Sequence, residues 1–187
     1  RLAGLDDWGL AGARAGQYVH DLVADELIVA ALLDRGVSVL TEESGVTHPP
    51  SAARPSITVV VDPIDGTANF ARGIAHYCVS IGYLEHGVPT TCGLYDPSHD
   101  RLYSAQRGQG AWLAEGAAAP RRLAVSPAAQ LEDATVEVGW SLRRPQEEYL
   151  ALVGRVLSAG CAFRRSGSGA LGLADVASGK LVLDTSG

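Results

Sequence analysis

The sequence contains no methionine, and its first residue is Arg1. Aromatic residues make up 6% of the 187 residues and charged residues 19%, against about a quarter charged in an average globular domain. With 47% hydrophobic residues the chain can still bury a core, and the low hydrophobicity and high net charge of disordered chains are absent. We therefore expect one domain or two small ones, and the missing initiator leaves open whether the chain is a fragment.

An excess of basic residues is also missing. The formal net charge is −6 and the pI is about 5.3, whereas a nucleic-acid binder needs a basic face. No apolar run approaches the roughly 18 residues that indicate a transmembrane helix. We therefore expect neither a nucleic-acid partner nor a membrane partner.

Cysteine is sparse as well. The chain has three cysteines, an odd number, at Cys78, Cys92 and Cys161. No two of them are spaced like a zinc-binding pair. Disulfide frameworks and zinc sites are therefore not indicated. We expect reduced, mostly buried thiols in a cytoplasmic protein.

Hydrophobic patterning predicts a helix pair and a meander of strands in the first half and an alternation of strand and helix in the second, so that the chain contains both α and β elements. A hairpin is expected around His86-Gly87, and a seam between two parts near 132–135, which gives parts 1–133 and 134–187. The predicted helices are 21–34, 145–159 and 170–178. The predicted strands are 37–40, 57–61, 77–85, 88–95, 101–105, 111–114, 136–140, 161–164 and 181–183.

Acidic residues follow two of these strands. Asp62 and Asp65 lie just after the run 57–61, and Glu42 lies 20 residues before Asp62, just after another strand. If the two strands are neighbours, their ends meet and the three carboxylates converge. Hard divalent cations such as Mg²⁺ take oxygen ligands, usually one or two carboxylates with water and phosphate. The spacing therefore indicates a divalent-cation site, with Pro63 stiffening the turn.

Residues 66–70 are typical of the first turn of a helix. N–H groups at a helix start bind phosphate, and Gly66 lets the backbone approach a ligand. Cations beside a phosphate cradle suit phosphoryl transfer to water. A structural alternative is an Asx-turn that caps a helix. That alternative explains one aspartate, but not a buried strand that ends in two acids.

Four stretches resemble the inositol monophosphatase family of Mg²⁺-dependent, lithium-sensitive phosphomonoesterases. The family signature D-P-[IL]-D-G-T-x-N-F is met throughout by Asp62 to Phe70, within VVVDPIDGTANFARGIAHYCVSIG. The acidic pair in VLTEESG and the stretch RRSGSGALGLADVASGKL at 164–181 match further family patterns. DLVA, from Asp21, is similar to the family's D-L-V-T, so the resemblance spans roughly 21–183.

The resemblance implies an α/β fold, the layered sugar-phosphatase fold of alternating helix and sheet layers, together with a homodimer and a small phosphorylated alcohol as substrate. Four oxygen donors would hold Mg²⁺: Glu42, Asp62, Asp65 and the carbonyl of Ile64. Glu42, Asp65 and Thr67 would be catalytic, with Glu42 and Thr67 positioning the attacking water and Glu43 supporting them from outside the ligand shell. Gly66 and Thr67 would bind phosphate through backbone N–H groups. The alcohol part would lie beside one loop: Gly167, Ser168, Gly169 and Ala170.

The chain departs from the family in one respect that matters. The later W-D-x-A-A-G motif, whose aspartate completes the family's metal site, does not occur before Gly187, and Asp184 lies in a different context. We therefore expect the carboxy-terminal part, 134–187, to be incomplete and one metal ligand to be missing.

Several functions remain open. The first is hydrolysis of inositol monophosphate by metal-activated water. Related enzymes of this fold act on histidinol phosphate, fructose bisphosphate, NADP or phosphoadenosine phosphate. A haloacid-dehalogenase-type phosphatase has a D-x-D-G-T motif, but its acids stand two apart, whereas Asp62 and Asp65 stand three apart. The last alternative is a truncated relative that binds metal or a partner without turnover.

Overall fold

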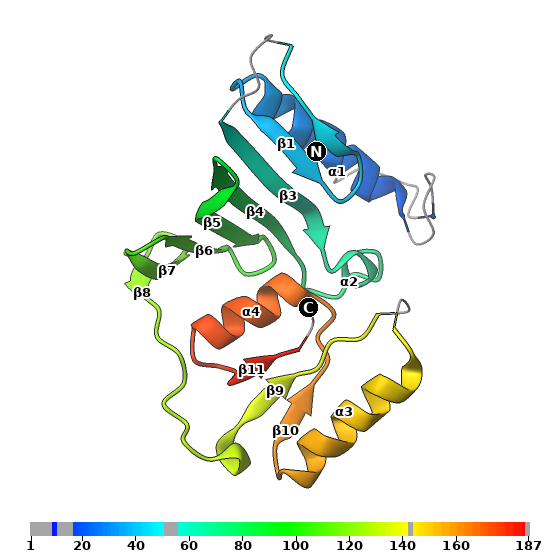
Figure 1. The fold of residues 1–187 in the computed structure, drawn as a ribbon, viewed down its shortest axis with the longest axis vertical. Helices are drawn as coiled ribbons and strands as arrows, with labels where there is room; N and C mark the ends of the chain where they lie inside the picture. The colour runs from blue at the N-terminus through cyan, green and yellow to red at the C-terminus, as the bar shows by residue number, and fades with distance from the viewer. Residues whose placement is uncertain (1–8, 11–16, 51–55, 142–143, 186–187) are drawn as a thin grey trace.

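The computed structural model describes residues 9–10, 17–50, 56–141 and 144–185. Its main layer is an eight-stranded mixed sheet with the order β2-β1-β3-β4-β5-β6-β7-β8 (Figure 1). β1 (Ser38–Thr41) and β3 (Ile57–Asp65) are parallel, and all other neighbours are antiparallel. The remaining strands are β2 (Gly45–Thr47), β4 (Cys78–Glu85), β5 (Val88–Asp96), β6 (Arg101–Gln106), β7 (Gly110–Glu115) and β8 (Arg121–Arg122).

Helices cover both faces of this sheet. α1 (Val19–Leu33) packs on one face, where Val39, Val59 and Val61 form the core. On the other face Cys78 and Leu113 contact α4 (Gly169–Ala177). Side chains of successive strand residues alternate between the faces, so one sheet supplies both cores.

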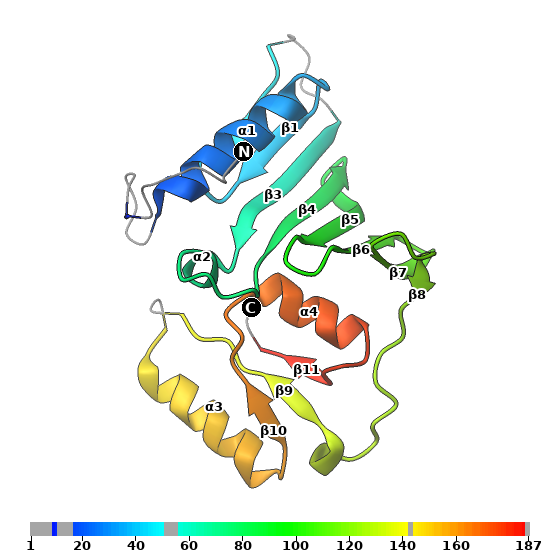
Figure 2. The ribbon, with the colours of Figure 1, turned by 180° about the vertical axis from the view of Figure 1, so that it is seen from behind.

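A second, smaller sheet lies beyond α4 (Figure 2). Its parallel strands β10 (Ala162–Arg164), β9 (Thr135–Glu137) and β11 (Leu183–Asp184) are adjacent in that order. α3 (Gln146–Ser158) packs on it through a core that includes Val136 and Val138. The result is an alternation of helical and sheet layers, which confirms the predicted layered α/β fold. Two short elements complete the set: α2 (Thr67–Phe70) and η1 (Leu131–Asp133).

Most predicted elements form close to their expected bounds. The hairpin turn is confirmed, since His86 and Gly87 both have positive φ, 51° and 79°, as a type I′ turn requires. The predictions were wrong in several details. β2 and β8 were not predicted, and β9 is shorter than the expected strand 136–140. β3 continues through Asp65 instead of ending before Asp62, and β11 lies slightly later than the expected strand 181–183.

The boundary between the sheets falls between Arg122 and Thr135. The division into parts 1–133 and 134–187 stays a prediction. Within the described residues, no helix combines the length and the apolar character that a membrane crossing requires.

Candidate functional site

A β-bulge near the end of β3 turns two aspartates to the same side. Asp62 pairs with Ser80 and Asp65 with Cys78, so three steps on β3 oppose two on β4. In a regular strand, residues three apart point to opposite faces, and one extra residue removes this offset. Pro63 lies in the bulge, where its missing N–H breaks no ladder. Burial first, and then the charge of Asp65, raises the pKa of Asp62 to about 7.

Glu42 follows β1 directly, in the hairpin loop that leads to β2. β1 and β3 are parallel neighbours, with Thr41 opposite Val61, so Glu42 and Asp62 leave the sheet at the same end. After burial and Asp65, the charge of Glu42 is the next cause of the raised pKa of Asp62. The condition under which the carboxylates were expected to converge, that the two strands are neighbours, is therefore met.

Asp21 of α1 joins this acidic group, and the sequence analysis gave it no role. The residue is 3% exposed, and its Oδ2 accepts a hydrogen bond from the Tyr18 N–H at 3.2 Å. Burial first raises its pKa to about 6, and the charges of Glu43 and Glu42 add to the effect. The nearby Thr67 hydroxyl acts in the opposite direction and lowers this pKa. Only the packing of α1 against the sheet reveals this aspartate.

Gly66 and Thr67 begin α2 beside the acids. The Thr67 hydroxyl also lies 3.0 Å from the carbonyl oxygen of Ile64, to which it can donate. Gly66 has a φ of +98°, and a Cβ there would meet the carbonyl oxygen of His76 at 3.0 Å and the Cβ of Tyr77 at 3.1 Å. The glycine is therefore required by packing against 76–77, in addition to any approach of a ligand.

The loop that leads into α4 contacts the site as well. The Ser168 hydroxyl donates to Asp65 Oδ2 at 2.5 Å, and the Ala170 N–H donates to the same oxygen at 2.7 Å. Two of the residues predicted to contact substrate thus contact a predicted metal ligand. Gly167 packs on Asn69, since a Cβ at Gly167 would lie 3.1 Å from the Asn69 amide nitrogen.

The predicted ligands suit a hard cation in their chemistry. All are oxygen donors, and neighbouring carboxylates repel each other unless a cation or a proton intervenes. Among the described residues, no three Asp, Glu, His or Cys side chains are grouped so that they could hold one metal ion as they stand. Described hydrogen bonds use Asp62 Oδ1, from the Ile64 N–H at 3.1 Å, and Asp65 Oδ2. No described hydrogen bond uses the other oxygen of either carboxylate, and a cation would bind there, with the remaining ligands moving closer to Asp65.

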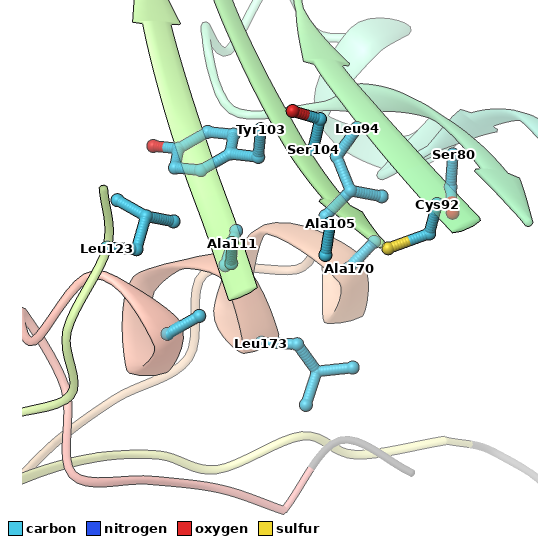
Figure 3. A pocket seen from close by; sticks show the side chains of 12 residues that line it. Ser80, Cys92, Leu94, Tyr103, Ser104, Ala105, Ala111, Leu123, Ala170 and Leu173 are labelled. Carbon is cyan, nitrogen blue, oxygen red and sulfur yellow. The ribbon is translucent and has the colours of Figure 1, made fainter. Parts of the chain in front are cut away.

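Two cavities adjoin α4. One, of about 280 Å³, lies between α4 and the strands β5, β6 and β7 (Figure 3). None of its 12 lining side chains is charged, so it does not suit a phosphate. The other, of about 260 Å³, contains three cationic side chains and the His99 imidazole, each near a carboxylate. These pairs are Arg101–Glu115, Lys180–Asp175, Arg164–Glu137 and His99–Asp96.

The alternating layers and the acidic end of the main sheet define a layered α/β protein with a carboxylate site. The chain belongs to the inositol monophosphatase family, whose model matches residues 13–183. It is 37% identical over 166 residues to the "Nus factor SuhB" of Xylella fastidiosa, covering 86% of this chain and 56% of that one. It is 37% identical over 123 residues to the "Inositol-1-monophosphatase" of Rhizobium meliloti, covering 65% and 44%.

Solved structures agree with this membership. The extragenic suppressor protein suhB from Bartonella henselae has a TM-score of 0.80 at 31% identity, covering 96% of this chain and 67% of that one. The inositol monophosphatase from Anabaena has a TM-score of 0.70 at 33% identity, covering 85% and 62%. The chain spans about half the length of the first curated relatives that it matches.

Proposed function

We propose that the chain carries the phosphoryl-transfer site of a Mg²⁺-dependent phosphatase for small phosphate monoesters, with inositol monophosphate as the first candidate substrate. The observation that carries the proposal is the bulge in β3, which brings Asp62 and Asp65 to one side of the strand, next to Glu42 and the start of α2. Family membership and the name of the Rhizobium meliloti relative support it.

A bound Mg²⁺ would polarise the phosphate and lower the pKa of the attacking water. It would be held by Glu42, Asp62, Asp65 and the Ile64 carbonyl. Gly66 and Thr67 would hold phosphate oxygens, because the first turn of a helix leaves its N–H groups without intrahelical partners.

Asp21 and Thr67 would handle the proton of the attacking water. The Thr67 hydroxyl would turn from the Ile64 carbonyl to Asp21, give its proton to that carboxylate and accept one from the water, so that Asp21 is the final acceptor. A carboxylate whose pKa is raised to about 6, by burial first, suits a general base near neutral pH. Glu42 would help to orient the water. Asp21 therefore joins the candidate catalytic residues Glu42, Asp65 and Thr67.

The metal is tested by thermal unfolding of the whole chain with and without Mg²⁺. A ligand of the folded state at 100 times its Kd adds about 2.7 kcal/mol to the free energy of unfolding. For a chain of this size, this amounts to a rise in Tm of about 5–10 °C. Asp62→Asn should abolish the rise, whereas Glu26→Gln, on the exposed side of α1, should retain it. A wild-type Tm that does not change when Mg²⁺ is added would contradict the proposal.

The reaction is tested by Mg²⁺-dependent phosphate release. The panel contains inositol monophosphate, histidinol phosphate, fructose bisphosphate, NADP and phosphoadenosine phosphate. We expect Glu42→Gln and Asp21→Asn to remove turnover, with Glu26→Gln again as the matched control. Where the gene encodes a longer product, that product is assayed in parallel, because the relatives are longer.

A chain that binds metal without turnover is the second candidate. It is favoured by relatives named "Nus factor SuhB", a name that states no enzymatic activity. Mg²⁺ binding without phosphate release from any of the five esters would support it. The homodimer and the cytoplasmic location stay predictions, and light scattering tests the former.

A further inference from the structure

We propose that Ser168 is a positioning residue for Asp65: its hydroxyl fixes which oxygen of that carboxylate faces the metal, and so links metal binding to the loop before α4. The inference rests on the proposed function, because it concerns the same site. It assigns to Ser168 a role toward Asp65 in place of the predicted contact with substrate.

The direction of the hydrogen bond follows from its partners. An ionised carboxylate only accepts, so the proton of Ser168 points to Asp65 Oδ2, 2.5 Å away. The same oxygen of Ser168 accepts from the Leu171 N–H at 3.3 Å and so caps α4. Ser168 is 1% exposed, so water cannot readily replace it. Both functions of this hydroxyl, donor and acceptor, are therefore used.

Hydrogen bonds hold one carboxylate oxygen of Asp65, and the other oxygen is left to bind the cation. Oδ2 also accepts the Ala170 N–H at 2.7 Å, and the Cys78 thiol lies 3.9 Å away. A carboxylate fixed in this way presents Oδ1 as a single-oxygen ligand. Partners that orient a ligand from behind typically change metal affinity by about 10–100-fold when they are removed.

The contact joins segments 103 residues apart, and a second contact holds the same loop. The Asn69 amide donates to the carbonyl oxygens of Ser166 and His76, at 2.8 and 2.7 Å. Ser166 in turn donates to the buried carboxylate of Glu137, at the end of β9. Because coupling between two binding events is reciprocal, metal binding at Asp65 should stabilise the docking of this loop, and loosening the loop should weaken the metal.

Mn²⁺ serves as the probe, with its affinity for the whole chain measured by electron paramagnetic resonance. Ser168→Ala and Ser168→Gly both remove the hydroxyl, Ser168→Thr keeps it, and Ser178→Ala is the matched control. Ser178 lies just after α4, where its hydroxyl donates to the Asp175 carbonyl at 3.2 Å, away from Asp65. We expect the Ala and Gly variants to bind Mn²⁺ about 10–100-fold more weakly, the Thr variant to keep most of the affinity, and the control to match wild type.

The alanine and glycine variants separate positioning from helix capping. Glycine is a better N-cap than alanine, so urea unfolding should show the larger stability loss in Ser168→Ala. Equal losses of Mn²⁺ affinity in both variants support positioning. The proposal is overturned if the loss of Mn²⁺ affinity is proportional to the loss of stability in the two variants. It is also overturned if Ser168→Gly keeps the wild-type affinity for Mn²⁺. If Ser168→Ala does not fold, Ser168→Gly and Ser168→Thr decide the matter. A wild-type chain that binds no Mn²⁺ overturns the proposed function as well.

Discussion

Replacing Gly66 with alanine should lower the free energy of unfolding through two separable effects. A φ of +98° costs an L-residue about 1–2 kcal/mol. A Cβ at 3.0 Å from the His76 carbonyl oxygen and 3.1 Å from the Tyr77 Cβ overpacks the site, which costs about 1–3 kcal/mol. Alanine also restricts the unfolded chain more than glycine does, which offsets about 0.4–1 kcal/mol of this loss of stability. The expected net loss is about 3 kcal/mol.

Gly73→Ala is the matched control for this substitution. Gly73 has a φ of +68°, and a Cβ there would meet nothing within 4 Å, so only the backbone effect applies and the loss should be about 1 kcal/mol. Urea unfolding measures both losses, and Tm should fall by about 6–12 °C for Gly66→Ala and about 2–4 °C for Gly73→Ala. Equal losses would refute the reasoning, because they would show that residues 76–77 move aside at no cost.

Two further predictions concern other parts of the chain. Arg164→Gln leaves the buried Glu137 carboxylate without the cation 3.2 Å away, and should cost about 2 kcal/mol, less than a fully buried pair because Arg164 is 41% exposed. Arg165→Gln, which removes only a contact with an aromatic ring, should cost about 0.5 kcal/mol in the same urea titration, and equal losses would contradict the argument. Burial raises the pKa of the Cys78 thiol to about 12, so a disulfide reagent at pH 8 should modify the exposed Cys92 in the native protein and Cys78 only after unfolding. Equal rates at the two cysteines in the native protein would contradict this.

Local sequence signals accounted for much of the fold. A turn at His86-Gly87 needs only the left-handed preference of its residues, and the β4–β5 hairpin forms there. The β-branched run before Asp62 indicated a buried strand, and β3 pairs on both sides. β2 was missed because Gly45–Thr47 is too short to show alternation. It exists because the loop after Thr41 folds back on β1.

The site was predictable where its residues are close in sequence and not where packing brings them together. The motif from Asp62 to Thr67 placed two acids and a helix start next to each other, but strand alternation alone would have separated the acids. The bulge at Pro63 decides the outcome, and its position depends on pairing with β4. Asp21 reaches the site because α1 packs across β1 and β3, and no local pattern specifies that crossing.

The contact between Ser168 and Asp65 shows why residues shared by a helix cap and a metal site are hard to assign from sequence. Serine before an apolar helix is expected as an N-cap, and Ser168 does accept from the Leu171 N–H. That role explains the serine completely at the level of α4. Only the position of α4 against the end of β3 turns the proton of the same hydroxyl toward a carboxylate 103 residues away. A cap needs an acceptor and a carboxylate needs a donor, and a hydroxyl satisfies both at once.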